Sequence, residues 1–214
     1  MAVRYVSSTT AEVIDGAAAA IGLAAAGRDF HRRGWVLGTS GNFSALLGND
    51  PFRLLITRSR VDKGALTEHD FLTVDSTGAV VEGEGQPSAE TALHLAIVIA
   101  TGAGSVIHTH SVSSTVLSQK LGKAKGVTLN GYEMLKGLSG VQSHTHRECV
   151  PILENSQDYH TLSGEVEKLL LREPGLHGFL LRAHGLYTWG ADVAEARRHA
   201  EILEFLIEVT RWQS

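Results

Sequence analysis

The stretch Ser105-Val106-Ile107-His108-Thr109-His110-Ser111 places two histidines one residue apart at the end of a short apolar run. The run predicts a buried strand, in which alternate side chains point to the same face. His108 and His110 therefore face the same way and can hold one metal ion, since imidazole nitrogens suit zinc, copper, iron and nickel. Two strand histidines can equally hydrogen-bond to backbone and solvent, so the prediction of a metal site depends on further ligands.

The composition indicates one globular domain whose main partner is neither nucleic acid nor an anionic membrane. The chain has 214 residues, of which 43% are hydrophobic, enough to bury one sizeable core. A formal net charge of −4 argues against nucleic acid or an anionic membrane as the main partner, because both favour a basic surface. Cys149 is the only cysteine, which excludes an intramolecular disulfide and favours a reducing, cytoplasmic location.

The order of apolar runs and turn residues predicts an α/β (α+β) fold, with a mainly antiparallel central sheet covered by helices. Three early strands without long helices between them favour antiparallel neighbours. A first helix is expected from Thr9 or Thr10 to about Arg33, and a closing helix over residues 193–210. Besides the histidine strand, the predicted strands are 42–47, 52–57, 71–75, 79–82, 127–130, 140–143, 149–153 and 178–182, and the other predicted helices are 87–102, 111–121 and 163–172.

A third metal ligand is expected at His184, which directly follows the apolar run 179–183. Strand ends of one sheet can meet, and three histidines with one open position form a catalytic zinc arrangement. His144 and His146 make a second His-x-His pair and compete for this role. They lie in the polar run 143–148, which is typical of a solvated loop.

Short polar residues and glycines suggest where an anion could bind. The segment 38–44 lies between a helix and a strand, where free backbone N–H groups can wrap an anion, although an ordinary turn has the same composition. Residues 57–60 end a strand and Ser88 stands near a helix N-terminus, which are two further anion sites. Convergence of these sites would indicate a phosphorylated substrate. The candidate binding residues are Ser40, Gly41, Asn42, Ser59 and Ser88.

Two glutamates are candidates for proton transfer. Glu133 and Glu90 each lie at an element boundary among few other charges, and a carboxylate near a metal pocket can be tuned for acid/base work. A single glutamate is more often a solvated surface group, so neither residue is assigned on its own.

Together these segments resemble the class II aldolase/adducin family over nearly the whole chain. The matching pieces, in the family's order, are 39–44, 56–59, 87–90, 108–110 and 183–186. Within the family, residues 61–64, 131–137 and 150–155 look most like the methylthioribulose-1-phosphate dehydratase branch. The sequence departs from the family at Arg58 and Arg60, which stand where a Thr-Pro-Ser-Gly turn is usual, and at Ala89, which replaces a frequent serine. Whether the arginines bind phosphate stays open.

The resemblance implies a single domain over residues 1–214 with a three-layer architecture and one zinc ion per subunit, held by His108, His110 and His184. It also implies a sugar phosphate substrate, Glu133 as the dehydratase acid/base, and a homotetramer with sites at subunit boundaries. In aldolase members the glutamate that matches Glu90 is the catalytic one. A sugar-phosphate aldolase or epimerase is therefore the first alternative, and a noncatalytic adducin-like interaction domain is the second.

Overall fold

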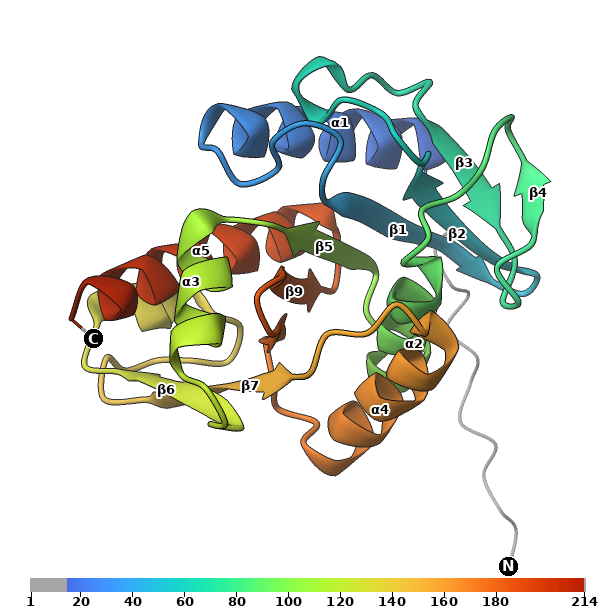
Figure 1. Cartoon of the computed structure of the whole chain (residues 1–214). Coiled ribbons are helices and arrows are strands. Elements are labelled where there is room, and N and C mark those ends of the chain that lie inside the picture. The colour runs from blue at the N-terminus through green and yellow to red at the C-terminus, as the bar shows by residue number, and fades with distance from the viewer. Residues whose placement is uncertain (1–14, 214) are drawn as a thin grey trace, which may run out of the picture.

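The computed structural model describes residues 15–213, whose nine strands form one sheet in the order β4-β3-β2-β1-β5-β9-β8-β7-β6 (Figure 1). Only β7 and β8 pair in parallel, and every other neighbouring pair is antiparallel, as predicted. The strands are β1 (Asn42–Asn49), β2 (Phe52–Thr57), β3 (Phe71–Val74), β4 (Val80–Glu82), β5 (Ser105–Thr109), β6 (Gly126–Asn130), β7 (Arg147–Leu153), β8 (Gly178–Leu181) and β9 (Gly185–Gly190).

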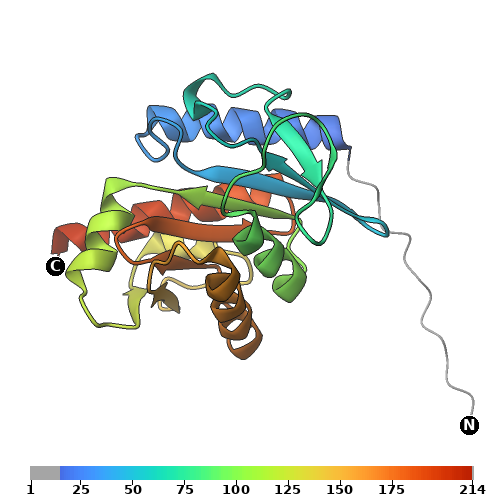
Figure 2. The same cartoon turned by 45° about the vertical axis from the view of Figure 1, so that its right-hand side comes forward.

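Helices cover both faces of the sheet and give the expected three layers (Figures 1 and 2). Helices α2 (Thr91–Thr101) and α4 (Tyr159–Arg172) share one apolar core with the sheet. On the opposite face, α1 (Gly16–Arg32) and the closing helix α5 (Val193–Gln213) share a second core, and α3 (Val112–Lys120) and α5 share a third. Two short 3-10 helices, η1 (Lys63–Ala65) and η2 (Glu133–Gly137), lie in connections.

Side chains alternate between the two faces of the sheet along β5, which explains how this buried central strand can hold a histidine on one chosen face. Val106 packs in the core beneath α2 and α4, whereas Ile107 packs in the core beneath α1 and α5. Since side chains alternate, His108 lies on the α2 side and Thr109 on the α5 side. The histidine strand pairs with β1 on one side and β9 on the other, so its position is fixed from both edges.

The structure shifts the starts of the helices predicted over 87–102 and 163–172 to Thr91 and Tyr159, and it changes the predicted strands at two places. Residues 140–143, predicted as a strand, form none, because Gly140 has φ +75° and Val141 N donates to Leu138 O in a turn. Strand β9 (Gly185–Gly190) was not predicted, yet it lies between β5 and β8. These two changes leave the order of the layers intact.

The first helix begins at Gly16 with Asp15 as N-cap, whose carboxylate accepts a hydrogen bond from Ala17 N. The predicted caps Thr9 and Thr10 lie outside the described residues. Within residues 15–213, no helix has the length and apolar character needed to cross a membrane.

Candidate metal and substrate site

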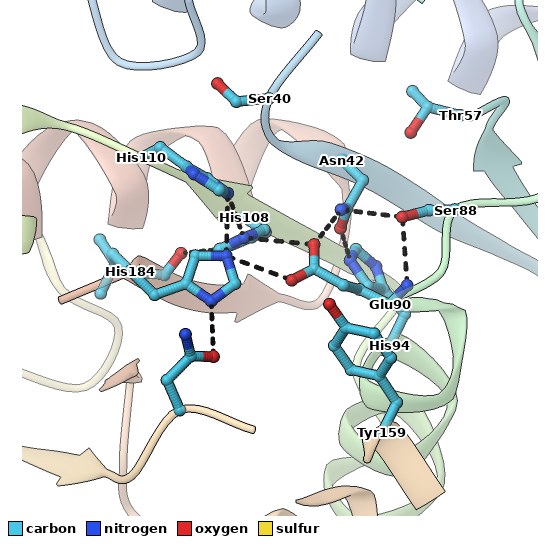
Figure 3. Close-up of polar contacts among 12 residues, drawn as sticks. Ser40, Asn42, Thr57, Ser88, Glu90, His94, His108, His110, Tyr159 and His184 are labelled. Carbon is cyan, nitrogen blue, oxygen red and sulfur yellow. Dashed lines mark hydrogen bonds and ion pairs between the residues drawn. The ribbon is translucent and has the colours of Figure 1, made fainter. Parts of the chain in front are cut away.

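Three histidines converge where β5 ends beside the turn between β8 and β9. Thr109 of β5 pairs with Leu186 of β9, which brings the preceding His184 next to His110. The Nε2 atoms of His110 and His108 are 2.8 Å apart, and those of His184 and His110 are 3.2 Å apart. Figure 3 shows the three rings pointing toward one another. The metal ligands expected from the sequence are therefore brought together in one chain.

In two of these rings, a hydrogen bond at Nδ1, on the side away from the group, fixes which nitrogen carries the proton. His108 Nδ1 donates to the Leu186 carbonyl at 2.9 Å, and His184 Nδ1 donates to Asn155 Oδ1 at 3.1 Å. A neutral imidazole that donates at Nδ1 keeps a lone pair at Nε2. Burial lowers the pKa of His108 well below its usual value and lowers that of His110 to about 4, so both rings are neutral near pH 7. The converging nitrogens are thus lone-pair donors.

A carboxylate completes this group. Glu90, the N-cap of α2, is 7% exposed and accepts a hydrogen bond from Asn42 Nδ2 at 2.6 Å. Its carboxylate oxygens lie 3.4 Å from His108 Nε2 and 3.2 Å from His184 Nε2 (Figure 3). Glu90 Oε1 is buried and has no hydrogen-bond partner. A buried carboxylate oxygen that faces imidazole lone pairs is costly, and a cation bound among these atoms would stabilise it.

The donor set fits a divalent transition metal. One ligand atom from each of Glu90, His108, His110 and His184 lies within 4.8 Å of the others. Three imidazole nitrogens with a carboxylate oxygen match the ligand types of a catalytic zinc site, and they also suit iron, manganese or cobalt. The Asn155 and Leu186 acceptors behind the rings are of the kind that orients histidines at metal sites.

A pocket of about 540 Å³ opens beside this group. His110, His184 and Glu90 lie in its wall, whereas His108 lies beneath the surface with no exposed area. Glu90 is the only carboxylate among the described residues that line it. All five residues predicted to bind an anion also line it: Ser40, Gly41, Asn42, Ser59 and Ser88.

The anion loop, residues 38–44, owes its shape to close packing against β5. Gly41 has φ +74°, and a Cβ atom there would lie 2.8 Å from the His108 carbonyl oxygen and 2.6 Å from Val36 Cγ1. Only glycine fits this position. The next residue, Asn42, donates from Nδ2 to Ser88 Oγ at 3.0 Å, which links the loop to the start of α2. The sequence segments 38–44 and 87–90 are therefore neighbours at the site.

The two arginines that depart from the family pattern line the pocket but differ in environment. Arg58 Nη2 donates to Asp70 Oδ1 at 2.7 Å, so its charge is already paired. Arg60 is exposed and has a left-handed backbone with φ 62°. Neither arginine side chain is held by a hydrogen bond to the anion loop.

Glu133 does not line this pocket in the single chain. It starts η2, its side chain is 69% exposed, and it forms ion pairs with Lys136 and with His144 at 3.4 Å. The hydrogen bond from Lys136 holds the pKa of Glu133 below its usual value. Its neighbour Met134 is also exposed. The competing pair His144 and His146 lies in a loop, as expected, away from the pocket wall.

The structure adds site residues that sequence reasoning missed. Lys63 and Asn155 line the pocket from segments that are far apart in the sequence. Tyr187 of β9 is fully buried and stacks on His108, with ring centroids 3.8 Å apart at 11°. His94, buried on α2, hydrogen-bonds to Ser44 Oγ at 2.7 Å and to Asn42 Oδ1, so it orients the amide that holds Glu90.

A buried carboxyl supports the histidine strand from the opposite face. Glu204 of α5 accepts hydrogen bonds from Thr109 Oγ1, from Ser111 Oγ at 2.5 Å and from Ser114 Oγ at 3.3 Å. Burial raises the pKa of Glu204 to about 7, although the three hydroxyls act in the opposite direction. These contacts connect α5 to both sides of His110 in the chain.

This fold and site define a class of protein. The model of the class II aldolase and adducin N-terminal domain matches residues 21–210, so the chain belongs to the class II aldolase/adducin family. The methylthioribulose-1-phosphate dehydratase of Sorangium cellulosum (strain So ce56) is 43% identical and covers 83% of this chain and 84% of its own length. That of Methylococcus capsulatus (strain ATCC 33009 / NCIMB 11132 / Bath) is 44% identical over 86% of this chain and 88% of its own.

Solved structures agree with the family at the level of the fold. YgbL of Escherichia coli, a putative aldolase/epimerase/decarboxylase, superposes with a TM-score of 0.77 at 23% identity, over 93% of this chain and 91% of its own. L-fuculose-1-phosphate aldolase of Thermus thermophilus has a TM-score of 0.72 at 25% identity, over 92% of this chain and 94% of its own. The expectation of a class II aldolase-like architecture is confirmed.

Proposed function

We propose that the chain is a metal-dependent hydro-lyase that converts 5-methylthioribulose 1-phosphate to 2,3-diketo-5-methylthiopentyl 1-phosphate, a step of methionine salvage. The observation that carries this proposal is the group of His108, His110, His184 and Glu90 beside a pocket that the anion loop also lines. The names of relatives 43–46% identical to this chain support the same substrate and reaction.

A zinc ion bound by the three histidines would supply Lewis-acid stabilisation of the negative charge that develops on the C2 and C3 oxygens when the C3 proton leaves. Ser40, Gly41, Asn42, Ser59 and Ser88 would bind the 1-phosphate, because all five line the pocket beside the histidines. Binding energy at the phosphate would then position the reacting carbons.

Glu90 is the group we assign to removal of the C3 proton. It is the only carboxylate that lines the pocket in the described chain, and its Oε1 atom has no hydrogen-bond partner. The bond from Asn42 Nδ2 to the other oxygen holds the carboxylate in place. General base catalysis by a positioned carboxylate contributes roughly 10²–10⁴-fold to the rate.

Glu133 remains our proposed acid for the departing C4 hydroxyl, acting on the pocket of a second copy of the chain. Its exposure and the exposed Met134 beside it suit a subunit boundary, which the family resemblance implies for a homotetramer. Protonation of the hydroxyl releases water and leaves an enol, which ketonises to the 2,3-diketone. A cytoplasmic location remains our expectation as well.

Intersubunit complementation tests this placement. Glu133→Gln and His110→Ala subunits, each strongly impaired alone, are expected to regain part of the activity when co-assembled, because mixed oligomers contain some sites with both wild-type residues. Assembly of mixed oligomers without any regain would contradict an acid supplied by a second copy.

One observation favours an aldolase as the second candidate: Glu90 lies at the metal group whereas Glu133 does not. A product assay with 5-methylthioribulose 1-phosphate separates the reactions, since dehydration gives a product lighter by one water, whereas aldol cleavage gives a three-carbon ketose phosphate and an aldehyde. We expect Glu133→Gln to reduce dehydration by roughly 10²-fold or more. Full dehydration activity in this variant would sink the assignment of Glu133.

A further inference from the structure

Lys63 is an unusually buried cation at the pocket. It begins η1, only 1% of the residue is exposed, and it lines the pocket beside the anion loop. Its ammonium group donates to the Thr39 carbonyl at 3.1 Å and to the Val61 carbonyl at 2.8 Å. An ammonium group has three N–H donors. Two carbonyls therefore leave one donor and the full positive charge available.

No carboxylate neutralises this charge within residues 15–213. Asp62 and Asp70 are close enough to influence Lys63 electrostatically, but neither forms an ion pair with it. Asp62 accepts from Gly64 N at 2.8 Å, and Asp70 accepts from Arg58 and from Thr67. Burying an unpaired charge is costly, and an anionic ligand in the pocket would supply the missing counter-charge.

Lys63 also lies close to the metal group, because it lines the same pocket as His110 and His184. A ligand that binds Lys63 with an anionic group therefore places its adjacent atoms near the histidines. A 2-ketose 1-phosphate has this form, because its phosphate and its carbonyl carbon are separated by one carbon.

We propose that Lys63 is the cation that binds the substrate phosphate, and that it distinguishes phosphorylated from unphosphorylated ketoses. This inference rests on the sugar phosphate substrate proposed above. Arg58 is less suited because Asp70 already pairs its charge, and Arg60 is exposed to water. Burial lowers the pKa of Lys63 to about 8, which still leaves the ammonium protonated at neutral pH.

The test uses inorganic phosphate as the probe and the zinc-loaded full chain as the protein. Lys63→Met keeps an unbranched side chain that tolerates burial, and Lys63→Arg keeps the charge. The matched control is Lys123→Gln, which removes one charge from an exposed position outside the pocket. Isothermal titration should show phosphate affinity at least tenfold weaker in Lys63→Met, partly restored in Lys63→Arg and unchanged in Lys123→Gln, with equal zinc content in all proteins.

Kinetics separate binding from a structural role of Lys63. If Lys63 binds phosphate, Lys63→Met raises KM for the ketose 1-phosphate and abolishes competitive inhibition by phosphate. Phosphate affinity equal to wild type in Lys63→Met would overturn the inference, as would a loss of zinc in proportion to the loss of phosphate binding. Phosphate can bind without turnover, so the two proposals can fail separately. A phosphate affinity that depends on Lys63 in a protein that dehydrates no substrate would contradict the proposed reaction and would still support this inference.

A measurement on the wild-type protein covers the case in which Lys63→Met does not fold. In protein with ¹³C-labelled lysine, the Lys63 side-chain resonance is assigned as the signal missing from Lys63→Arg. Phosphate should shift that resonance in a saturable way and leave the Lys123 resonance unchanged. An unmoved Lys63 resonance at saturating phosphate would refute the inference.

Discussion

Asn155 offers a specific test of how the metal site is held. Its Oδ1 atom accepts the Nδ1 proton of His184 at 3.1 Å, the one hydrogen bond that nitrogen makes within residues 15–213. Asn155→Ala removes this acceptor, which frees the ring to rotate and to exchange tautomers. Loss of such an outer partner typically costs 10–100-fold in metal affinity. Since Asn155 is exposed and neutral, we expect the lower end, about tenfold or about 1.4 kcal/mol.

The assay is competition for zinc against a chromogenic chelator at constant pH. Gln157→Ala is the matched control, because Gln157 lines the same pocket and makes no hydrogen bond to a histidine in the described chain. Asn155→Asp should tighten binding, since a carboxylate is a stronger acceptor for the same proton. Unfolding by urea should change little in all three variants. Zinc affinity equal to wild type in Asn155→Ala, or an equal loss in Gln157→Ala, would refute the reasoning.

Two further predictions concern stability. Glu204 has a folded pKa of about 7 against an ordinary value of 4.5, so the folded state binds more protons between these pH values and its stability falls as pH rises through that range. Glu204→Gln should remove this pH-dependent loss of folding stability, which amounts to about 3 kcal/mol in total once the pH is above 7. If the variant and the wild type lost the same urea stability between pH 5 and pH 8, this reasoning would be contradicted. Gly185→Ala should lower both stability and zinc content, because its Cβ would overlap the Thr109 carbonyl oxygen. Gly164→Ala, on the helix α4 with open space around it, should instead add about 0.5–1 kcal/mol, and equal effects of the two glycine substitutions would be inconsistent with this packing.

Much of the fold follows from periodicity, and the exceptions have physical causes. The strands 42–47 and 52–57 were predicted within two residues of β1 and β2, because their apolar runs are separated by a Gly-Asn-Asp-Pro turn. The helix over 111–121 was predicted within one residue of α3, whose N-cap is Ser111. Strand β9 was not predicted, because apolar and polar residues do not alternate along it: Tyr187, Thr188 and Trp189 are all buried. Their burial arises from the position of β9 between β5 and β8.

The convergence of the three histidines was predictable, because His108 and His110 follow the period of a strand and His184 follows another strand. Lys63 and Asn155 were not, because their roles depend on segments that meet only in the folded sheet. The sequence offered Glu90 and Glu133 alike as acid/base groups. The folded chain brings Glu90 to the histidines and leaves Glu133 exposed. For this reason we propose that Glu133 acts on the pocket of a second copy.

The central claim is that this chain uses a bound metal to remove water from a ketose 1-phosphate. Its most direct test is mass spectrometry of 5-methylthioribulose 1-phosphate incubated with protein of measured metal content, before and after chelation and metal reloading. We predict a product lighter by one water, formed in proportion to bound metal and lost with the chelated protein. Unchanged substrate with fully metal-loaded protein, or the same yield after the metal is removed, would contradict the account.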